Sequence, residues 1–368
     1  MKKITILVDQ LYQHGGIEKL VAIKANYWVT HYNYNVTIVS TEQNNNPLIY
    51  ELDPKVQFLD LGINYHRLKS FFSFKNLTLA FLNIVKIQQY LSRNKPDYVL
   101  VASHIPMTYV LPFLIRGKTR IVKEFHFTKY YSHQNNNLKQ RVFNYIEAKY
   151  DTLVVLSPEE QSFYKTTNTV VIPNPVITAK GVVIIPQEKK ELIAATALRF
   201  APVKRLELLI DIWEQFSKTH PTWKLLIYGP LDNEYAAKIQ QLAVAKNLSA
   251  QIIFEGKTTH VLQELSKARV VLITSAQECF PLFLLEAHSV GVPVISFNCP
   301  TGPRNIIHNK KDGLLVENNN IPEFVSTLQK FSNNAGLQEE LALNALENAN
   351  LYQLDRVMKQ WKNKIFNT

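Results

Sequence analysis

Short apolar runs alternate along the chain with segments in which apolar residues recur at helical spacing. The first run, at residues 4–8, is followed by a Gly15-Gly16 turn and by apolar residues at helical spacing over 17–28. Continuous apolar runs separated by helices are typical of parallel strands that are buried on both faces. We therefore expect further strands at residues 35–40, 98–102, 120–124, 152–156 and 170–172.

The alternation of strands and helices then begins again. An amphipathic helix is expected at residues 205–217, and strands are expected at 192–197, 224–228, 251–254, 270–274 and 293–296. Between the two series, Pro173 and Pro175 interrupt regular structure. The pattern thus predicts an α/β protein of two doubly wound domains, at 1–175 and 176–345, followed by a helical tail at 346–368. Ligands of such sheets bind beyond the carboxyl ends of the strands.

The charge balance points to an anionic partner. The chain has 368 residues, with 41 Lys and Arg against 30 Asp and Glu and a formal net charge of +11. This excess favours a membrane surface, a nucleic acid or a phosphorylated ligand. Two cysteines are too few for a disulfide framework, so we expect a cytoplasmic protein. The first apolar run is shorter than a signal-peptide core, and Pro106 and Pro112 make residues 98–115 a poor spanning helix.

A strongly basic segment lies between Leu61 and Lys123, with Asp97 as its one acidic residue. Its ten bases are Arg67, Lys69, Lys75, Lys86, Arg93, Lys95, Arg116, Lys118, Arg120 and Lys123, and the interleaved apolar residues are Phe71, Phe72, Phe74, Leu77, Phe81, Leu82 and Ile84. Bases among bulky apolar side chains are what a helix at a membrane interface needs. We expect docking on an anionic membrane; the alternative is a solvated basic face on a helix whose apolar side is core.

Two glutamates separated by seven residues, Glu278 and Glu286, mark the most informative stretch. Glu278 lies in a loop after the strand expected at 270–274, and Pro281 suits the first position of a helix that carries Glu286. Backbone N–H groups around Phe280 and Leu282 would hold an anion at the helix N-terminus. The segment thus offers a carboxylate for hydroxyls, a cradle for a diphosphate and a carboxylate for a ribose; the alternative is a helix with two ordinary glutamates.

Further motifs stand in order around this segment. They are Gly15-Gly16-Ile17-Glu18, Ile172-Pro173-Asn174-Pro175-Val176, Ala197-Leu198-Arg199 with Lys204, Tyr228-Gly229-Pro230, Phe254-Glu255-Gly256 and Thr301-Gly302-Pro303-Arg304-Asn305-Ile306-Ile307. Together they resemble the retaining GT-B glycosyltransferases of group 1, the family-four enzymes of capsule and exopolysaccharide type, over nearly the whole chain. The resemblance implies two Rossmann-like domains facing a cleft. The acceptor would bind to 1–175 and the nucleotide sugar to 176–345, and the helix at 346–368 would cross back to the first domain.

The resemblance also implies roles for individual residues. Arg199 and Lys204 would bind the donor diphosphate, Glu278 the sugar hydroxyls and Glu286 the ribose. The active-site histidine near the donor sugar would be His126. The remaining implied contacts are Gly15 and Gly16 in an acceptor or phosphate loop, and Gly229, Glu255, Gly256, Phe280, Pro281 and Leu282 in the donor site. The family typically has glycine after the lysine, where this chain has Arg205.

Two fixed cations can stabilise a departing diphosphate where no metal does so. The sequence contains no Asp-x-Asp pair and no Cys/His cluster with metal spacing. We therefore expect neither a metal nor another cofactor.

The expected activity is retaining transfer of a hexose or N-acetylhexosamine from a UDP-sugar to a saccharide acceptor, lipid-linked and at the inner face of the membrane. This activity would serve the assembly of a cell-surface polysaccharide or glycoconjugate. One alternative is a GT-B nucleotide-sugar epimerase. A second, from a different class, is a nucleic-acid-binding protein; because no recognition module is present, we expect no nucleic-acid partner.

Overall fold

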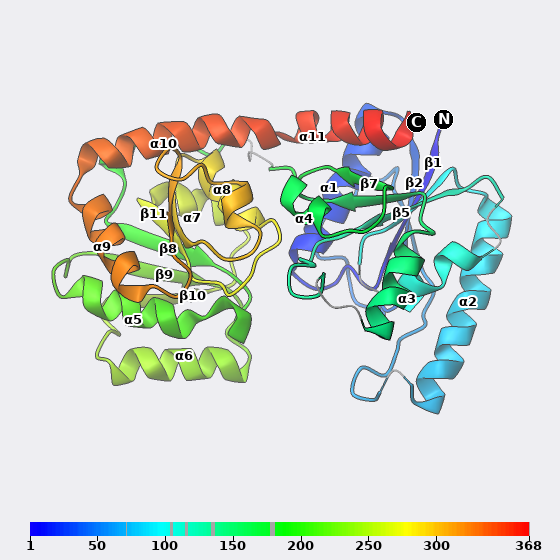
Figure 1. Cartoon of the computed structure of the whole chain (residues 1–368), viewed down its shortest axis with the longest axis horizontal. Coiled ribbons are helices and arrows are strands. Elements are labelled where there is room, and N and C mark those ends of the chain that lie inside the picture. Colours follow the sequence, from blue (N-terminus) through cyan, green and yellow to red (C-terminus); the bar gives the residue numbers. More distant parts are fainter. Residues whose placement is uncertain (71, 104–105, 115–116, 134–136, 177–180, 368) are drawn as a thin grey trace. The chain divides into compact units, whose positions relative to one another are not determined.

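The computed structural model describes residues 1–70, 72–103, 106–114, 117–133, 137–176 and 181–367 (Figure 1). Contacts divide the chain into two compact units. Unit 1 consists of Met1–Ile172 and Met358–Thr368, and unit 2 consists of Pro173–Val357. Each unit is built on one parallel sheet, which confirms the predicted α/β class with two doubly wound folds.

Unit 1 contains a seven-stranded sheet in the order β3-β2-β1-β4-β5-β6-β7. The strands are β1 (Lys3–Val8), β2 (Asn35–Ser40), β3 (Gln57–Asp60), β4 (Tyr98–Val101), β5 (Arg120–Glu124), β6 (Thr152–Val155) and β7 (Thr169–Val171). The helices are α1 (Gly16–His31), α2 (Phe74–Asn94), α3 (Leu138–Glu147) and α4 (Pro158–Ser162), with short turns η1 (Pro106–Tyr109) and η2 (Leu111–Phe113). All neighbouring strands are parallel, so each connection crosses a face of the sheet.

The end of the chain completes the core of unit 1. Helix α11 (Leu354–Trp361) spans the division between the units and is followed by the short π-helix η7 (Lys362–Phe366). The fully buried ring of Trp28 contacts Trp361 and Phe366, with centroids 5.6 and 5.0 Å away. The residues after Val357 therefore belong to the folded core of unit 1 and are not a loose tail.

Unit 2 contains a six-stranded parallel sheet in the order β10-β9-β8-β11-β12-β13. The strands are β8 (Ile193–Ala197), β9 (Lys224–Tyr228), β10 (Ile252–Gly256), β11 (Val270–Ile273), β12 (Val294–Phe297) and β13 (Gly313–Val316). The helices are α5 (Leu206–Ser217), α6 (Glu234–Ala245), α7 (Val261–Lys267), α8 (Leu282–Ser289), α9 (Ile321–Ser332) and α10 (Ala335–Ala349), with turns η3 (Gln187–Lys189), η4 (Pro202–Lys204), η5 (Pro303–Asn305) and η6 (Asn350–Tyr352). Large fully buried rings, among them Trp213, Phe216 and Phe297, fill its core.

The apolar pattern predicts neither β3 nor β13. Residues of β3 alternate between exposed and half-buried positions at the edge of the sheet, and β13 offers three apolar residues after Gly313. Neither strand therefore presents the long buried run on which the prediction rests.

Strand order reverses at β1 and β4 in unit 1 and at β8 and β11 in unit 2. Such a switch point opens a crevice between loops that leave the carboxyl ends of neighbouring strands in opposite directions. In unit 2 these are the loops after β8 and β11, which carry Lys204 and Glu278. Within the described residues, none of the helices has the length and apolarity needed to cross a membrane.

Candidate active site

The loops that follow β8 and β11 are bonded to each other. The backbone N–H of Ala276 donates to the carbonyl of Val203 at 2.7 Å. The hydroxyl of Thr274, just after β11, donates to the carbonyls of Lys204 and Arg205 at 3.1 and 3.2 Å. These bonds hold the two loops as one structure at the switch point of the sheet.

Lys204 and Glu278 are in direct contact across these loops. Lys204 Nζ lies 2.5 Å from Glu278 Oε1, and the hydroxyl of Ser275 donates to the same oxygen at 2.6 Å. The two side chains are 22% and 13% exposed, so the pair is partly desolvated and a charge-assisted bond between them is strong. Within the described residues, no donor binds Glu278 Oε2. The pair therefore offers a ligand an oriented ammonium group and a carboxylate oxygen.

A third loop, which follows β12, fixes the backbone of Glu278. Glu278 N–H donates to the carbonyl of Pro300 at 2.9 Å, and the N–H groups of Thr301 and Gly302 donate to the carbonyl of Glu278 at 2.7 and 2.8 Å. A Cβ on Gly302 would lie 2.8 Å from Glu278 Cβ and 2.7 Å from Pro281 Cδ. Such distances are below normal contact, so the loop reaches Glu278 because residue 302 has no side chain.

Replacing Gly302 by alanine is expected to lower the rate of sugar transfer by about 10²-fold. The new methyl group must push Glu278 or Pro281 aside, and displacement of a positioning group by about 1 Å costs an enzyme that much. Steady-state kinetics of G302A, with circular dichroism to confirm folding, measures the effect.

The matched control for this variant is G336A, because Gly336 lies near the start of α10, where a Cβ meets its nearest neighbour at an ordinary 3.5 Å. This change should leave activity intact and raise stability by about 0.5–1 kcal/mol. Wild-type activity in G302A would contradict the packing argument.

Arg199 lies in an anchored loop with an exposed side chain. Leu198 N–H donates to the carbonyl of Tyr228 at 3.0 Å, and Gly229 N–H donates to the carbonyl of Gly256 at 2.8 Å. Gly229 has φ +149°, and a Cβ there would lie 2.1 Å from the carbonyl oxygen of Leu198. The glycine turn after β9 therefore supports the Arg199 loop. Within the described residues, the Arg199 guanidinium has no hydrogen-bond or ion-pair partner, so it is available to an anionic ligand.

Arg205 adopts the left-handed conformation, with φ 49° and ψ 48°. Glycine takes this conformation most easily, which explains why glycine is typical at this position of the resembling family. In this chain the Arg205 guanidinium bonds the side-chain oxygens of Asn319 and, at 3.4 Å, Asn318, both in the loop after β13. These bonds offset the backbone cost and tie a further loop to the Lys204 turn.

The start of α8 differs by one residue from the prediction. Pro281 is the N-cap in extended conformation, and the helix begins at Leu282. The ring of Phe280 is 5% exposed and packs against Tyr352, with centroids 5.6 Å apart, and its carbonyl accepts from Asn174 at 3.1 Å. Phe280 thus serves the donor loop as a packing anchor. Its ring is buried, so the predicted contact of Phe280 with the donor would be made by its backbone.

The other residues predicted for the donor site lie at or beyond the carboxyl ends of strands of the unit 2 sheet. Glu286 is half-buried in α8, after the strand β11, and Glu255 is exposed at the end of β10. Gly256, the last residue of β10, has φ +74°. Within the described residues, no three His, Cys, Asp or Glu side chains gather closely enough to hold a metal ion.

His126 lies in unit 1, just beyond the end of β5, in a buried group of charges. Its Nε2 is 3.4 Å from Glu124 Oε2, and Glu124 pairs with Lys24 of α1; the three side chains are 6%, 3% and 3% exposed. Burial lowers the pKa of His126 below its usual value, so the imidazole is neutral at pH 7. Neither Lys24 nor Glu124 was among the residues predicted from the sequence to lie near His126. The one signal for Lys24 in the sequence was its place among the apolar residues that recur at helical spacing over 17–28, where a lysine is unusual.

Gly15 and Gly16 lie where the predicted turn places them. Gly15 is the extended N-cap of α1 and Gly16 is its first residue. The carboxylate of Glu18 folds over Gly15, where a Cβ would lie 2.1 Å from Glu18 Oε2, and Glu18 accepts from Gln10 at 2.5 Å. The turn is therefore closed by a side chain of α1.

The basic segment between Leu61 and Lys123 does not form one charged face. Burial lowers the pKa of Lys123 to about 7, and its Nζ donates to the carbonyl of Ser103 at 2.7 Å. Arg67 forms a bidentate pair with Glu42 at 2.8 Å, and Lys86 donates to the carbonyl of Leu61 at 2.5 Å. Burial or pairing thus occupies these three bases, so docking on an anionic membrane, which stays a prediction, would depend on the other bases of the segment. Phe71 and Arg116 lie outside the described residues.

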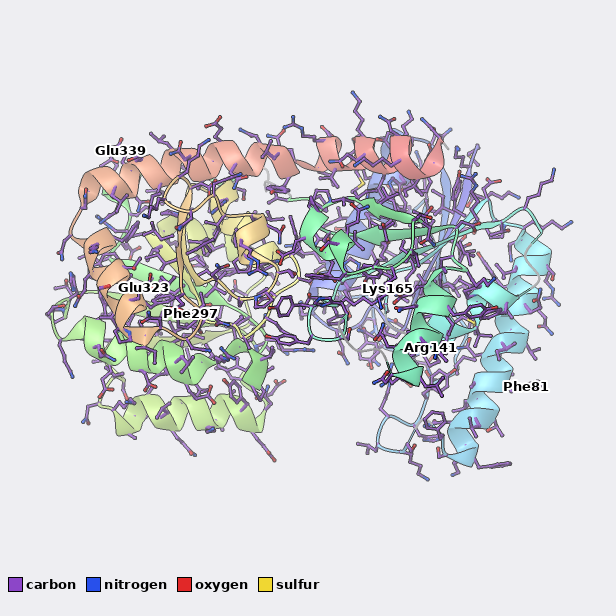
Figure 2. All side chains as sticks on the ribbon, in the orientation of Figure 1. Phe81, Arg141, Lys165, Phe297, Glu323 and Glu339 are labelled. Carbon is purple, nitrogen blue, oxygen red and sulfur yellow. The ribbon has the colours of Figure 1, made fainter. Side chains whose placement is uncertain are left out.

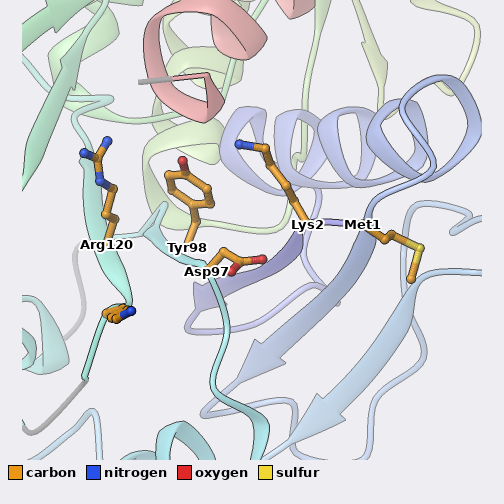
Figure 3. Close-up of a pocket in the computed structure, with 6 residues that line it drawn as sticks. Met1, Lys2, Asp97, Tyr98 and Arg120 are labelled. Carbon is orange, nitrogen blue, oxygen red and sulfur yellow. The ribbon is translucent and has the colours of Figure 1, made fainter.

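Lys118 and Arg120 lie where the strands of the unit 1 sheet begin, at the end of the sheet away from His126. With Met1, Lys2, Asp97 and Tyr98 they line a pocket of about 280 Å³ (Figure 3). Asp97 precedes β4 and Arg120 begins β5, so this pocket is at the amino ends of the strands. It is separate from the predicted site residues, which follow the carboxyl ends.

Family models match both halves of the chain. Residues 14–180 match the model described as glycosyltransferase family 4, and residues 183–348 match glycosyl transferases group 1. An uncharacterized glycosyltransferase of Haemophilus influenzae is 23% identical over 368 residues, which cover 98% of this chain and 99% of that protein. The amylovoran biosynthesis glycosyltransferase AmsD of Erwinia amylovora is 26% identical over 383 residues, covering 100% of both chains.

Solved structures of glycosyltransferases share the fold over 100% of both chains. The crystal structure of Staphylococcus aureus TarM with fondaparinux, α-GlcNAc-glycerol and UDP has a TM-score of 0.79 and 18% identity. That of Anabaena HepE with UDP and glucose has a TM-score of 0.78 and 16% identity. The two parallel-sheet units, the full-length likeness and the two matching models lead to one conclusion: this chain is a glycosyltransferase of GT-B fold and belongs to the group 1 family.

Proposed function

We propose that the protein transfers a hexose or N-acetylhexosamine from a UDP-sugar to a saccharide acceptor, with retention of the anomeric configuration, in assembly of a cell-surface polysaccharide or glycoconjugate. The observation that carries the proposal is the Lys204–Glu278 pair, held at 2.5 Å beside the exposed Arg199 loop. The UDP bound to TarM and HepE and the part of AmsD in amylovoran biosynthesis support the donor and the pathway class.

Unit 2 supplies the charges that this reaction requires. Arg199 and Lys204 bind the diphosphate and stabilise the negative charge that develops on it as the bond to the sugar breaks. Glu278 holds the Lys204 ammonium through Oε1 and accepts a sugar hydroxyl through Oε2, while Glu286 accepts the ribose hydroxyls. Gly229, Glu255, Gly256, Pro281 and Leu282 form the backbone and edge of the same donor site, around the Phe280 anchor.

Unit 1 supplies the acceptor side. The neutral His126 imidazole donates to or accepts from a sugar hydroxyl. The Gly15-Gly16 turn binds the acceptor or a phosphate once the Glu18 side chain, which covers Gly15, moves aside. The acceptor hydroxyl attacks C1 of the sugar on the face from which UDP departs. The C1–O(phosphate) bond breaks, the new glycosidic bond forms, and the hydroxyl proton passes to the departing phosphate oxygen.

Each of the variants R199A and K204A is expected to slow sugar transfer by about 10²-fold, as the loss of one electrostatic stabiliser does. Because these cations take the place of a metal in the proposal, EDTA should leave wild-type turnover nearly unchanged. Initial rates of UDP release in the presence of acceptor measure both effects. Complete inhibition by EDTA that added metal reverses would refute the metal-free mechanism.

The acceptor in this proposal is lipid-linked, and the protein works at the inner face of the membrane as a peripheral protein. A screen of UDP-sugars with and without membrane lipid extract tests the activity as a whole. UDP release that depends on the acceptor, with radiolabelled sugar in the lipid fraction, is the expected result. Interconversion of the UDP-sugar without transfer would show an epimerase instead, and salt-sensitive binding to DNA or RNA without transfer would favour a nucleic-acid-binding protein.

A further inference from the structure

The first half of α2 exposes large apolar side chains to solvent and turns polar side chains toward the protein, the reverse of the usual arrangement. Phe74, Leu77 and Phe81 recur at the spacing of one helical face and are 82%, 47% and 69% exposed. The side that faces the protein carries Asn76 and Asn83, which are 2% and 0% exposed. A helix in a soluble domain normally buries its apolar side, so this reversal indicates that the apolar side meets a nonaqueous partner.

The buried amides explain how the reversal is maintained. Asn76 accepts from the N–H of His66 at 2.9 Å and donates to the carbonyls of His66 and Ser70 at 3.2 and 3.0 Å. Asn83 donates to the hydroxyl of Tyr65 at 3.1 Å. These bonds fasten the loop before α2 to the inner side of the helix. Side-chain bonding to that loop, in place of apolar packing, thus fixes the orientation of α2.

The fastened loop extends the exposed apolar surface. Leu68 is 104% exposed and Phe72 is 79% exposed. We define the apolar edge of α2 as Leu68, Phe72, Phe74, Leu77 and Phe81. In Figure 1 the loop and the first turns of α2 lie below the sheet of unit 1, and in Figure 2 Phe81 lies on the side of α2 away from that sheet.

The charges around the apolar edge decide between possible partners. Lys69 and Lys75 are exposed beside it, and the sequence has no acidic residue from Leu61 to Pro96. Two copies of this chain would bring basic surfaces together, which costs free energy. An anionic lipid surface suits both the exposed apolar side chains and the lysines beside them. Its interface accommodates aromatic and aliphatic side chains, and its headgroups attract lysines.

We propose that the apolar edge of α2 inserts into the interface of an anionic lipid membrane, with Lys69 and Lys75 at the headgroups. This assigns membrane contact to one structured element, and not to the whole basic segment between Leu61 and Lys123. The proposal rests on the proposed function in one respect, the lipid-linked acceptor that gives membrane binding its purpose.

The test is co-sedimentation of the full-length protein with vesicles of phosphatidylcholine, alone or mixed with phosphatidylglycerol. Wild type should bind the mixed vesicles and bind phosphatidylcholine alone far more weakly. F74S/F81S should lower the partition coefficient by roughly tenfold for each phenylalanine, and K69Q/K75Q by roughly fivefold for each lysine.

Matched controls come from exposed positions in unit 2. Val244 and Leu343 are 63% and 61% exposed, so V244S/L343S removes comparable apolar groups. Lys218 and Lys330 are exposed, so K218Q/K330Q removes the same charge. Both control proteins should bind vesicles as wild type does, with unchanged circular dichroism and thermal unfolding in all variants.

The outcomes separate this proposal from the proposed function. Vesicle binding that follows the predicted order, without transfer from any UDP-sugar, supports the membrane surface and refutes the function. Transfer to a soluble acceptor without vesicle binding by wild type supports the function and overturns the surface. Full binding by F74S/F81S also overturns it. The proposal is also overturned if wild type forms a dimer in sedimentation velocity and F74S/F81S does not, because the apolar edge of α2 would then be an interface between copies of the chain.

Discussion

The variant E278Q is expected to lose sugar transfer by about 10³-fold while its affinity for UDP stays close to that of wild type. Glu278 Oε1 holds the Lys204 ammonium at 2.5 Å, so the neutral amide would no longer orient the cation that faces the diphosphate in the proposed function. The same substitution weakens the acceptor for a sugar hydroxyl. Both interactions matter most as charge develops in the transition state. Turnover measured alongside calorimetric UDP binding separates catalysis from binding.

Two further variants make this result specific. Glu339 is exposed on α10 (Figure 2), so E339Q changes the same functional group far along the chain and should leave turnover unchanged. E286A should act in the opposite way to E278Q and weaken UDP binding by about 1–3 kcal/mol, the cost of a lost charged hydrogen bond. If E278Q lost UDP affinity as severely as turnover, its carboxylate would be a nucleotide ligand and not a group that acts in the transition state.

The parts of the candidate donor site that lie close together in sequence could be proposed from the sequence alone. Buried strands end at Ala197 and Ile273, and a run of apolar residues on either side of each loop identifies it as a connection at the carboxyl ends of the strands. The motifs within these loops supplied the candidate residues Arg199, Lys204 and Glu278. The fold class followed from the same alternation of strands and helices.

The links between the loops could not be read from the sequence. Ser275 gives no signal of its own, yet its hydroxyl bonds the same oxygen as Lys204. Gly302 stands in a recognisable motif, but its contact with Glu278 depends on the packing of three loops from separate strands. The side-chain bonds of Arg205 to Asn318 and Asn319 join segments that are distant in the chain. Such contacts arise from tertiary packing, which periodicity does not encode.

In unit 1, the sequence suggested His126 as a candidate residue, and the structure adds its buried neighbours. Lys24 occupies a position of α1 that the helical pattern assigns to the core, which is unusual for a lysine. Its partner Glu124 ends a strand on another part of the chain, so the pair becomes visible in three dimensions. The ammonium group of Lys24 also lies 4.9 Å from the ring centre of Trp361. The buried Lys24 ammonium thus pairs with Glu124, beside His126, and also lies over a ring of the C-terminal helix α11.

The variant K24M is expected to lower the free energy of unfolding of unit 1 by about 3–5 kcal/mol. Lys24 and Glu124 are both 3% exposed, and removing one partner of a buried pair leaves an uncompensated charge. Because Lys24 is one of the charges that lower the pKa of His126, this pKa should rise in the variant. Urea unfolding followed by hydrogen exchange in unit 1 peptides measures stability, and NMR of the imidazole measures the pKa.

The pH dependence of the same variant provides an independent check. Burial raises the pKa of Glu124, but Lys24 and His126 outweigh it and bring the pKa to about 2, below its ordinary 4.5. The pair therefore stabilises the fold fully above pH 4.5, and this contribution disappears as the pH falls toward 2. The deficit of K24M should shrink over that range. In the control K246M, which breaks a surface pair with Glu214, the loss should stay within about 1 kcal/mol. A K24M deficit that is constant from pH 7 to pH 2 would mean that lost packing, and not the ion pair, causes it.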